Sequence, residues 1–310
     1  MTGAKPVPGS SLDGLTVVMT FTPKGGAGKT HLQDILEGCA TLSGLRTLVA
    51  DVDDGNNGLR KRIGEDNVLK ISWECSPSYA EEWVRTYVRD IDFLGFDLGA
   101  NILSSGLPIA NFLGQVLALL KDQGAAIHIC VVASTNAPVA NLLPRLQETY
   151  GRLGEITVVT NNQDGSEAFP DWARGELIHT FSLPHIPAGV QAVRLRRQVP
   201  LAGFLLHPED GFRLATAMVA KAALQVASQP RVQAVLRCNP VTTLTPLAAA
   251  APASKLYTID TMASAADAKL GANDALKRAF DALLEPNLGE NAILKAAIAF
   301  RNQHAVYREH

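Results

Sequence analysis

Six short apolar runs divide the first part of the chain and predict buried β-strands. They cover residues 15–21, 46–52, 91–98, 126–133, 156–160 and 180–183. Most of these runs end in a turn of polar or small residues, and such continuous apolar runs are typical of strands that are covered on both faces. The hydrophobic pattern therefore predicts a central sheet rather than a series of exposed hairpins.

The segments between these runs show the spacing of amphipathic helices. After the first run, apolar residues recur at i, i+3, i+4, i+7 and i+8, namely Leu32, Ile35, Leu36, Cys39 and Ala40. Further helices are expected over residues 107–122, 138–150, 190–197 and 211–236, the last broken at Pro230. Strands that alternate with helices predict an α/β fold, with a mostly parallel sheet and helices on both faces.

The same patterns divide the chain into four parts. A loose lead-in rich in Gly, Pro and Ser covers residues 1–14, and the α/β domain covers residues 15–237. Residues 238–254 are rich in Pro, Thr and Ala and carry no charge, which predicts a linker or an extended wrap. Residues 255–310 are expected to form a helical C-terminal appendage.

A glycine-rich stretch, residues 22–30, lies between the first predicted strand and the first predicted helix. Its glycines let backbone N–H groups approach phosphate oxygens without Cβ clashes, and the start of a helix adds partial positive charge. Lys29 would reach the β- and γ-phosphates of a nucleotide, and the Thr30 hydroxyl would bind Mg²⁺. We therefore interpret residues 22–30, the phosphate loop, as a nucleotide site rather than an ordinary glycine-rich turn.

A second lysine, Lys24, opens this loop, and Pro23 stands where the usual pattern has glycine. The stretch Lys-Gly-Gly-Ala-Gly-Lys-Thr resembles the deviant Walker A motif of the ParA/MinD family of P-loop NTPases. The resemblance extends over residues 15–230 and implies an ATP-bound homodimer, in which Lys24 crosses to the phosphates held by the other subunit. It also implies ATP and Mg²⁺ as cofactors, and nucleotide contacts from Gly25, Gly26, Ala27, Gly28, Lys29, Thr30 and His31.

Two of the predicted strands end in carboxylates. Asp51 and Asp53 close the run 46–52, and side chains at i and i+2 on an extended strand point to the same side. The family resemblance places Asp51 in the Mg²⁺ shell and gives Asp53 the role of positioning the attacking water. Asp54 replaces a proline that is usual in the family, which predicts a less fixed backbone. Without the phosphate loop before it, the stretch 51–57 would be a solvated acidic turn.

Asp97 lies at the end of the run 91–98 and is followed closely by Gly99. Apolar residues closed by an aspartate and a small-residue turn are typical of a Walker B strand. Asp97 is therefore expected to hold Mg²⁺ through a water, and Gly99 to let the turn approach the γ-phosphate. By the same resemblance, Asn161 would bind the adenine edge and Pro187 would lie in the loop over the base and ribose. The alternative for Asn161 is a polar turn that closes a strand.

The composition limits other kinds of chemistry. The chain has 310 residues, of which 47% are apolar, and a net charge of −2, so any nucleic-acid binding would need local basic patches. The four cysteines are far apart, which indicates neither a zinc site nor a redox dithiol. No H-E-x-x-H or Gly-x-Ser-x-Gly motif is present. The sequence shows neither a signal peptide nor a long apolar span, which predicts a cytoplasmic protein.

Two basic segments supply such local patches. The first is Arg60, Lys61 and Arg62, and the second is Arg194, Arg196 and Arg197. A dimer would double this set on one surface, which favours sequence-independent contacts with DNA phosphates. A solvated helix face is the alternative for each segment.

These features predict an ATPase that dimerises with ATP and acts as a positioning switch on DNA, as in plasmid partition or conjugative transfer. Its hydrolysis would be slow until a protein partner stimulates it, because no arginine in a recognisable finger position accompanies the loop. The alternative is a MinD-like switch, or one associated with a secretion or polysaccharide machine, that acts at a membrane or on a protein partner. Membrane binding is less favoured, since the last predicted helix has few basic residues. A metabolic synthetase of the wider family is a third candidate, without a distinct pocket signal in the sequence.

Overall fold

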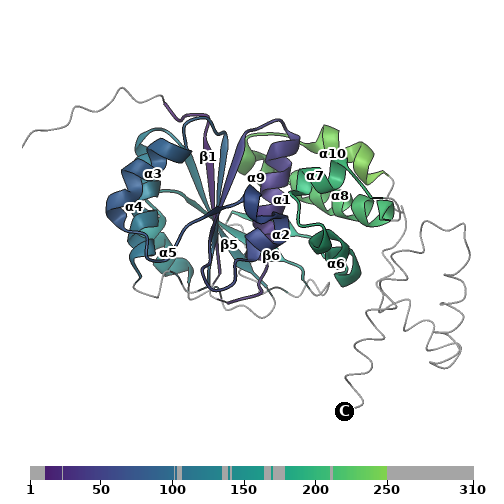
Figure 1. Ribbon diagram of the computed structural model, residues 1–310, viewed down its shortest axis with the longest axis horizontal. Coiled ribbons are helices and arrows are strands. Elements are labelled where there is room, and N and C mark those ends of the chain that lie inside the picture. Colours follow the sequence, from purple (N-terminus) through teal and green to yellow (C-terminus); the bar gives the residue numbers. More distant parts are fainter. Residues whose placement is uncertain are drawn as a thin grey trace, which may run out of the picture.

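A computed structural model describes residues 11–22, 24–100, 102, 107–134, 139, 142–163, 169, 179–209 and 212–249. Its centre is a seven-stranded sheet, and every strand pair in the described part is parallel (Figure 1). The strands are β1 (Thr16–Phe21), β2 (Thr47–Val52), β3 (Leu69–Lys70), β4 (Phe93–Leu98), β5 (Ala126–Ala133), β6 (Glu155–Asn161) and β7 (Thr180–Leu183). Their order across the sheet is β3-β2-β4-β1-β5-β6-β7. The carboxyl ends of β2, β4 and β1 are therefore neighbours.

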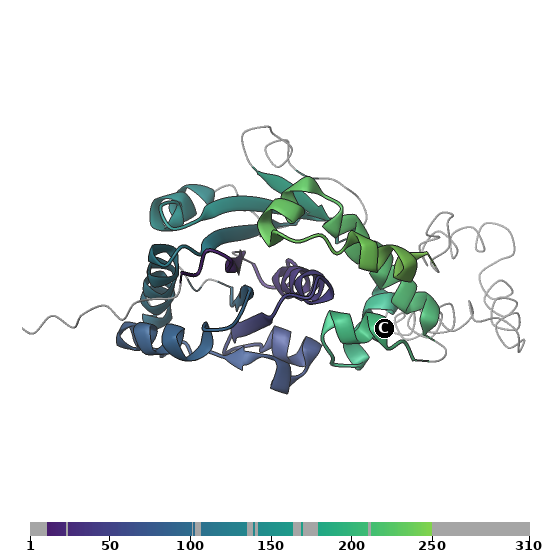
Figure 2. The same ribbon diagram turned by 90° about the horizontal axis from the view of Figure 1, so that it is seen from above.

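Helices cover both faces of this sheet (Figures 1 and 2). One face carries α3 (Ala80–Tyr87), α4 (Pro108–Asp122) and α5 (Leu143–Tyr150). The other carries α1 (Lys29–Leu42), α2 (Gly58–Ile63), α6 (Ala188–Arg196), α7 (Leu201–Leu206), α8 (Arg213–Ala227), α9 (Pro230–Leu236) and α10 (Val241–Ala248). Two short 3₁₀ turns, η1 (Glu65–Asn67) and η2 (Pro77–Tyr79), precede β3 and α3. The predicted α/β fold, with a parallel sheet and helices on both faces, is confirmed.

The central strands are apolar because both of their faces are covered. All six residues of β1 and all six of β4 are buried. Alternate side chains of β1 enter two different cores: Val18 packs on the side of α1, and Val17 and Met19 pack on the side of α4. The five apolar positions that predicted the first helix lie in α1 and are at most 2% exposed. Gly44, with a φ of 81°, follows the end of that helix.

Several element boundaries differ from the sequence-based predictions. The pattern does not predict β3, which has only two residues, or α7, which has six. The described part of the helix predicted over residues 138–150 begins at Leu143, so α5 is shorter than expected. In the part of the chain that the structure describes, no helix has the length and apolar character needed to cross a membrane.

The predicted linker, residues 238–254, is wrong over the range of α10. This helix packs against α8 and places Leu244 and Ala248 in the core. The sequence hides it because Pro246 lies inside the helix, where proline is normally unfavourable. The predicted C-terminal appendage, residues 255–310, lies outside the described residues.

The N-terminal lead-in ends earlier than predicted. The backbone N–H of Leu12 donates to the Gln123 carbonyl at 2.7 Å, and Arg237 donates to the Asp13 carbonyl at 2.7 Å. These bonds attach residues 12 and 13 to the ends of α4 and α9. The prediction of a loose segment is therefore wrong for residues 12–13, while residues 1–10 lie outside the described ranges.

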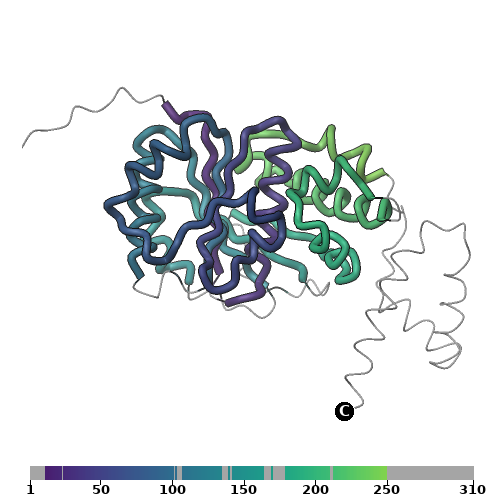
Figure 3. Tube along the Cα trace, in the orientation of Figure 1, coloured from purple at the N-terminus to yellow at the C-terminus, as the bar shows by residue number. Residues whose placement is uncertain are grey.

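The carboxyl edge of the sheet collects the segments that the sequence singles out. In the Cα trace, the phosphate loop follows β1 and leads into α1, and the turn after β2 leads into α2 (Figure 3). Asp97 lies near the end of β4, and Asn161 ends β6. This is the edge at which open α/β sheets bind their ligands.

Candidate functional site

Three polar side chains form a row across the ends of the central strands. Thr20 of β1 is in register with Asp97 of β4, and Asp97 is in register with Asp51 of β2. All three residues are at most 2% exposed. The Thr20 hydroxyl lies 3.1 Å from the Phe96 carbonyl and 3.3 Å from Asp97 Oδ1, and can donate to either. The row brings the acidic ends of two strands next to the strand that carries the phosphate loop.

The phosphate loop begins α1 with glycines in conformations that other residues rarely adopt. Gly26 has a φ of 76° and Gly28 a φ of 105°. A Cβ on Gly28 would clash with the amide nitrogen of Asn161, which itself donates to the Ala27 carbonyl at 2.8 Å. No side chain caps α1 at Gly28, and its first turn contains no acidic residue. The first N–H groups of α1 therefore keep the positive helix end that binds anions.

Lys29 is the first residue of α1 and is only 8% exposed. Burial lowers the pKa of its ammonium group, whereas the carboxylates of Asp97 and Asp53 raise it. The lysine thus lies close to both acidic strand ends. A lysine beside a glycine-rich helix start can pair with phosphate oxygens.

Asp97 forms a short hydrogen bond to the first turn of α1. Its Oδ2 accepts a hydrogen bond from Thr30 Oγ1 at 2.6 Å. Burial raises the pKa of Asp97 to about 7; the carboxylates of Asp51 and Asp53 act in the same direction, whereas the Thr30 bond and Lys29 oppose the shift. Asp97 is therefore a buried carboxylate that feels the negative charge of both Asp51 and Asp53.

Oxygen donors of this kind suit Mg²⁺. The Thr30 hydroxyl and the Asp97 carboxylate meet directly, and a divalent cation would relieve the crowding of negative charge that raises the pKa of Asp97. Mg²⁺ usually takes one or two protein oxygens and completes its shell with waters and substrate phosphates. Thr30 and Asp97 are thus fitted to hold this ion beside the phosphate loop.

Asp51 uses its carboxylate to hold the turn that follows it. Its Oδ1 accepts from the Asp53 N–H at 2.9 Å, and its Oδ2 accepts from the N–H groups of Leu59 and Arg60 at 3.1 and 3.2 Å. Burial is the main cause that raises its pKa. Asp51 therefore joins the end of β2 to the first turn of α2. Its place in the Mg²⁺ shell stays a prediction.

Asp53 is half-buried at the start of the turn. Its Oδ1 accepts from the N–H groups of Gly55 and Asn56 at 3.2 and 3.1 Å. Among the described residues, its Oδ2 has no hydrogen bond. One carboxylate oxygen is thus fixed by the backbone and the other can take a water, which is compatible with the predicted role of Asp53.

Asp54 anchors the turn through its side chain. Its Oδ2 accepts from the Trp73 N–H at 2.7 Å and from Ser72 Oγ at 3.1 Å, and its Oδ1 lies 3.2 Å from Lys70 Nζ. The expectation that Asp54 leaves this backbone less fixed than a proline would stays a prediction. Its carboxylate makes three contacts that a proline ring cannot make.

Asn161 lies directly against the phosphate loop and is 4% exposed. One N–H of its amide donates to the Ala27 carbonyl, so only the second N–H and the amide oxygen are left to bind adenine. Pro187 is buried and precedes the first residue of α6. The predicted roles of both residues at the base and ribose stay predictions.

His31 lies in the first turn of α1 and contacts α2. Its Nδ1 is 2.9 Å from Arg62 Nη2, and since a guanidinium only donates, Nδ1 is the acceptor. Burial, followed by the charge of Arg62, lowers the pKa of His31 to about 3. The ring is therefore neutral and links α1 to α2. A direct contact of its side chain with nucleotide stays a prediction.

Two of the arginines predicted to face DNA are buried. Arg62 and Arg194 pair with the two oxygens of Asp34, at 2.5 and 2.6 Å. Arg194 is 1% exposed, and its guanidinium also lies over the Phe204 ring. Asp34, Arg62 and Arg194, which we call the charge cluster, join α1, α2 and α6. The prediction that Arg62 and Arg194 contact DNA or a partner is wrong, because both side chains are buried and paired with Asp34.

The other four basic residues lie at the surface or close to it. Arg60 pairs with Glu65 at 3.2 Å, and Arg197 pairs with Glu209 at 3.0 Å. Arg196 is exposed and lies 3.5 Å from Glu209, and Lys61 is exposed on α2. Their proposed contacts with DNA stay predictions.

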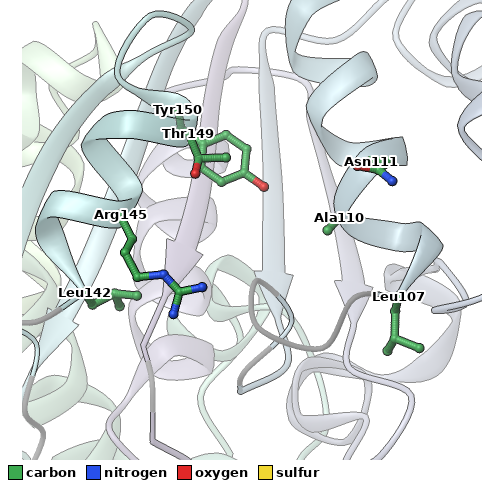
Figure 4. Close-up of a pocket in the computed structure, with 7 residues that line it drawn as sticks. All are labelled: Leu107, Ala110, Asn111, Leu142, Arg145, Thr149 and Tyr150. Carbon is green, nitrogen blue, oxygen red and sulfur yellow. The ribbon is translucent and has the colours of Figure 1, made fainter.

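A cavity of about 270 Å³ lies between α4 and α5, away from the charge cluster (Figure 4). It is lined by Leu107, Ala110, Asn111, Leu142, Arg145, Thr149 and Tyr150. In Figure 4 the Tyr150 hydroxyl points into the space between the two helices. None of the residues singled out by the sequence lines this cavity. The candidate site is therefore the carboxyl edge of the sheet.

Three residues of this region are not singled out by the sequence: Thr20, Asp34 and Trp73. The signal for Thr20 was a polar residue near the carboxyl end of an apolar strand, next to the phosphate loop. Asp34 lies on the side of the predicted helix opposite Leu32, where a charged residue normally faces solvent, so the pattern gives no sign of its burial. Trp73 has no such signal, because its neighbours lack periodicity.

Comparisons with known proteins give a likeness in backbone only. No protein-family model matches the sequence, and no curated protein matches it. One similar solved structure is the MinC:MinD cell division protein complex of Aquifex aeolicus, at 14% identity and a TM-score of 0.43, with 69% of this chain and 96% of that chain covered. Another is the septum site-determining protein MinD complexed with Mg-ADP from Pyrococcus horikoshii, at 15% identity and a TM-score of 0.40, with 76% and 97% covered.

A third is apo McdA of Cyanthece, at 13% identity and a TM-score of 0.42, with 74% of this chain and 99% of that chain covered. At identities this low, none of these structures assigns a role to a residue of this chain. The phosphate loop and the carboxylates at the strand ends are features of the chain itself. By these residues and their placement, the chain resembles the ParA/MinD family of P-loop ATPases.

Proposed function

We propose that the protein binds ATP with Mg²⁺ at the phosphate loop, hydrolyses it, and uses the nucleotide to control its own dimerisation. The observation that carries this proposal is the 2.6 Å contact between Thr30 Oγ1 and Asp97 Oδ2, beside the buried Lys29. It joins the first turn of α1 to the acidic end of β4. Thr30 and Asp97 would hold the metal ion, which neutralises phosphate charge when bound.

The chain's own groups divide the remaining work. The N–H groups of the phosphate loop and the Lys29 ammonium bind the phosphate oxygens and orient the γ-phosphate. Asp53, with one carboxylate oxygen held by Gly55 and Asn56, orients a water for attack on the γ-phosphorus. The bond from that phosphorus to the bridging oxygen breaks as the new bond forms, and the products are ADP and inorganic phosphate.

The dimer rests on the family resemblance and on Lys24. This lysine lies at the exposed start of the phosphate loop, where it can reach a second copy of the chain. A contact to the partner's phosphates favours the triphosphate over the diphosphate, because it depends on the additional charge. The dimer would therefore form with ATP and separate after hydrolysis.

DNA is the proposed surface on which such a dimer acts, with a smaller basic set than the sequence suggests. Lys61 and Arg196 are the exposed members of the two basic segments, although Arg196 shares Glu209 with Arg197; Arg60 pairs with Glu65. Lys61 is on α2, whose first turn is held by Asp51. Nucleotide binding at the acidic turn would thereby influence the position of Lys61. A protein or membrane partner is the alternative.

Two measurements on the purified full chain test the proposal. The first is phosphate release from ATP, which we expect to be slow in the parent and absent in Lys29→Ala. Asp53→Ala should bind ATP but release phosphate much more slowly, since the attacking water loses its orienting group. Lys121→Ala, on the exposed side of α4, is the matched control and should behave as the parent does.

The second measurement is the molar mass in solution with ATP and with ADP. We expect a dimer of Asp53→Ala with ATP and a monomer with ADP, and a monomer in both cases when Lys24→Ala is added. Equal masses with both nucleotides would refute the switch. Parent-like hydrolysis by Lys29→Ala would refute the site itself.

A further inference from the structure

We propose that Trp73 is a positioning residue for the hydrolysis proposed above: its indole ring holds the Asp53 carboxylate against the Gly99 turn, and Asp54 fixes the backbone of Trp73. This inference rests on the proposed function. It assigns a role to a segment, residues 69–73, that has no part in the phosphate loop or in the acidic strands.

The 69–73 segment runs beside the end of β2. The two strands pair only at Ala50 with Leu69 and at Asp51 with Lys70. The ladder continues with one more backbone bond, from the Ile71 N–H to the Asp51 carbonyl at 3.0 Å. At the next residue of β2 the bond comes from a side chain instead of the backbone: Trp73 Nε1 donates to the Val52 carbonyl at 2.5 Å. The indole thus extends the pairing to the last residue of β2.

Asp54 fixes the same segment from the other side of the turn. Its carboxylate accepts from the Trp73 N–H at 2.7 Å and from Ser72 Oγ at 3.1 Å, and it pairs with Lys70 at 3.2 Å. The first of these bonds is charge-assisted and short, a geometry typical of strong hydrogen bonds. The backbone N–H and the indole N–H of Trp73 are therefore both bound to residues 52–54.

The indole ring and the Asp53 carboxylate lie together beside two glycines. A Cβ placed on Gly99 would come within 3.0 Å of Trp73 Cζ2 and 3.2 Å of Asp53 Oδ1. A Cβ on Gly55 would lie 3.5 Å from the same oxygen and 3.9 Å from Trp73 Cη2. Ring and carboxylate thus border the same space beside these two glycines, between the turn after β2 and the turn after β4. A side chain at Gly99 would fit only if Trp73 or Asp53 moved by a few tenths of an ångström.

Trp73 also contacts the helix that follows the second turn. Its carbonyl accepts from the N–H of Ile109, in the first turn of α4, at 3.2 Å. One residue therefore joins the end of β2, the Gly99 turn and the start of α4. With its ring fixed in this way, Trp73 restricts the carboxylate of Asp53 to the orientation in which Oδ1 accepts from Gly55 and Asn56. Catalytic groups need such support, because small displacements cost much of the rate.

The test compares Trp73→Phe, Trp73→Ala and Asp54→Ala with the parent in ATP hydrolysis and ATP binding. We expect Trp73→Ala to lower kcat by about 10- to 100-fold, with KM and the ATP dissociation constant within about threefold of the parent. Trp73→Phe keeps a ring over Asp53 and should recover most of this loss. The kcat of Asp54→Ala should lie between those of Trp73→Ala and Trp73→Phe. A role in folding alone would not divide kcat from KM in this way.

Tryptophan fluorescence gives a readout that does not depend on turnover. Because the ring and the Asp53 carboxylate border the same space at Gly99, Mg-ATP should change the emission of the parent, and that change should vanish in Trp73→Phe. Trp83→Phe is the matched control, since Trp83 packs against Phe96 and Phe112 in the core. It should keep both the nucleotide-dependent change and the parent's kcat.

The outcomes separate this inference from the proposed function. A parent protein that neither binds nor hydrolyses ATP overturns the proposed function. A parent that does both, together with a folded Trp73→Ala whose kcat is within twofold of the parent, overturns only the inference. An equal loss in Trp83→Phe would also overturn it, because the effect would then be one of stability.

Discussion

Replacement of Asp34 by asparagine should be one of the most destabilising single changes in the domain. The two oxygens of Asp34 pair with Arg62 Nε at 2.5 Å and Arg194 Nη2 at 2.6 Å. The side chains of Asp34 and Arg194 are 1% exposed, and that of Arg62 is 9% exposed. The charges of Arg194 and Arg62 outweigh burial and lower the pKa of Asp34, so the carboxylate is ionised. Asp34→Asn leaves two buried guanidinium groups without their counter-ion.

The size of the effect follows from the charges involved. Removal of one partner from a buried ion pair costs about 3–5 kcal/mol. Two cations depend on Asp34, which places the expected loss near the upper end of that range. For a domain of this size, 1 kcal/mol corresponds to about 2–4 °C in the unfolding temperature. We therefore expect Asp34→Asn to unfold about 10–20 °C below the parent.

The assay is urea and thermal unfolding followed by circular dichroism, with two comparison variants. Arg194→Met leaves Asp34 paired with Arg62 and should cost less than Asp34→Asn, because the remaining charges balance. Asp90→Asn makes the same chemical change at a surface position, where the side chain is 86% exposed and lies 3.8 Å from Arg46. It should leave the unfolding temperature almost unchanged, as surface pairs contribute little.

The order of the stability losses in the three variants tests whether Asp34 is the central charge of the cluster. An Asp34→Asn protein that unfolds within about 1 kcal/mol of the parent would show that the charge cluster does not hold α1, α2 and α6 together. A larger loss for Arg194→Met than for Asp34→Asn would contradict the view that Asp34 is the central charge.

Three further predictions concern the loop, the pH dependence and the partner surface. Asn161→Ala removes the bond to the Ala27 carbonyl, so ATP affinity measured by titration should fall about fivefold or more, and parent-like affinity would refute the contact. Burial lowers the pKa of His128 to about 4, below its ordinary 6.5, so the native state must keep the ring neutral. Stability is therefore lost as the pH falls from about 6.5 to 4, by up to about 3 kcal/mol, and His128→Gln should lose less over this window in urea titrations. Lys61→Ala and Arg196→Ala should each weaken ATP-dependent binding to plain duplex DNA and reduce its salt dependence, and unchanged binding at low salt would move the proposed partner to a protein or membrane.

The general architecture and the main site could be predicted from local patterns. Fully apolar runs predict strands covered on both faces, and their polar ends predict where a ligand binds. Asp51 and Asp97 occupy neighbouring registers for this reason, although many residues separate them in the sequence. The loop glycines are explained by their conformations, such as the φ of 105° at Gly28.

What the sequence hides depends on contacts between distant residues. Arg62 and Arg194 look like surface cations, and only the packing of α1 against α2 and α6 brings them to Asp34. Trp73 is positioned by β3, a strand of only two residues that is too short to show a periodic hydrophobic pattern. The helix α10 contains Pro246, which suggests a linker until the burial of Leu244 is seen.

The most direct test of the nucleotide site is a calorimetric titration of Mg-ATP into the full chain and into Lys29→Ala. We expect one ATP bound per chain of the parent, and no measurable binding by a Lys29→Ala protein that unfolds at the parent's temperature. Lys29 is buried at the start of α1, and the charges of Asp97 and Asp53 act on its ammonium group. A parent that binds no ATP, or a Lys29→Ala protein that binds it equally well, would contradict the nucleotide site.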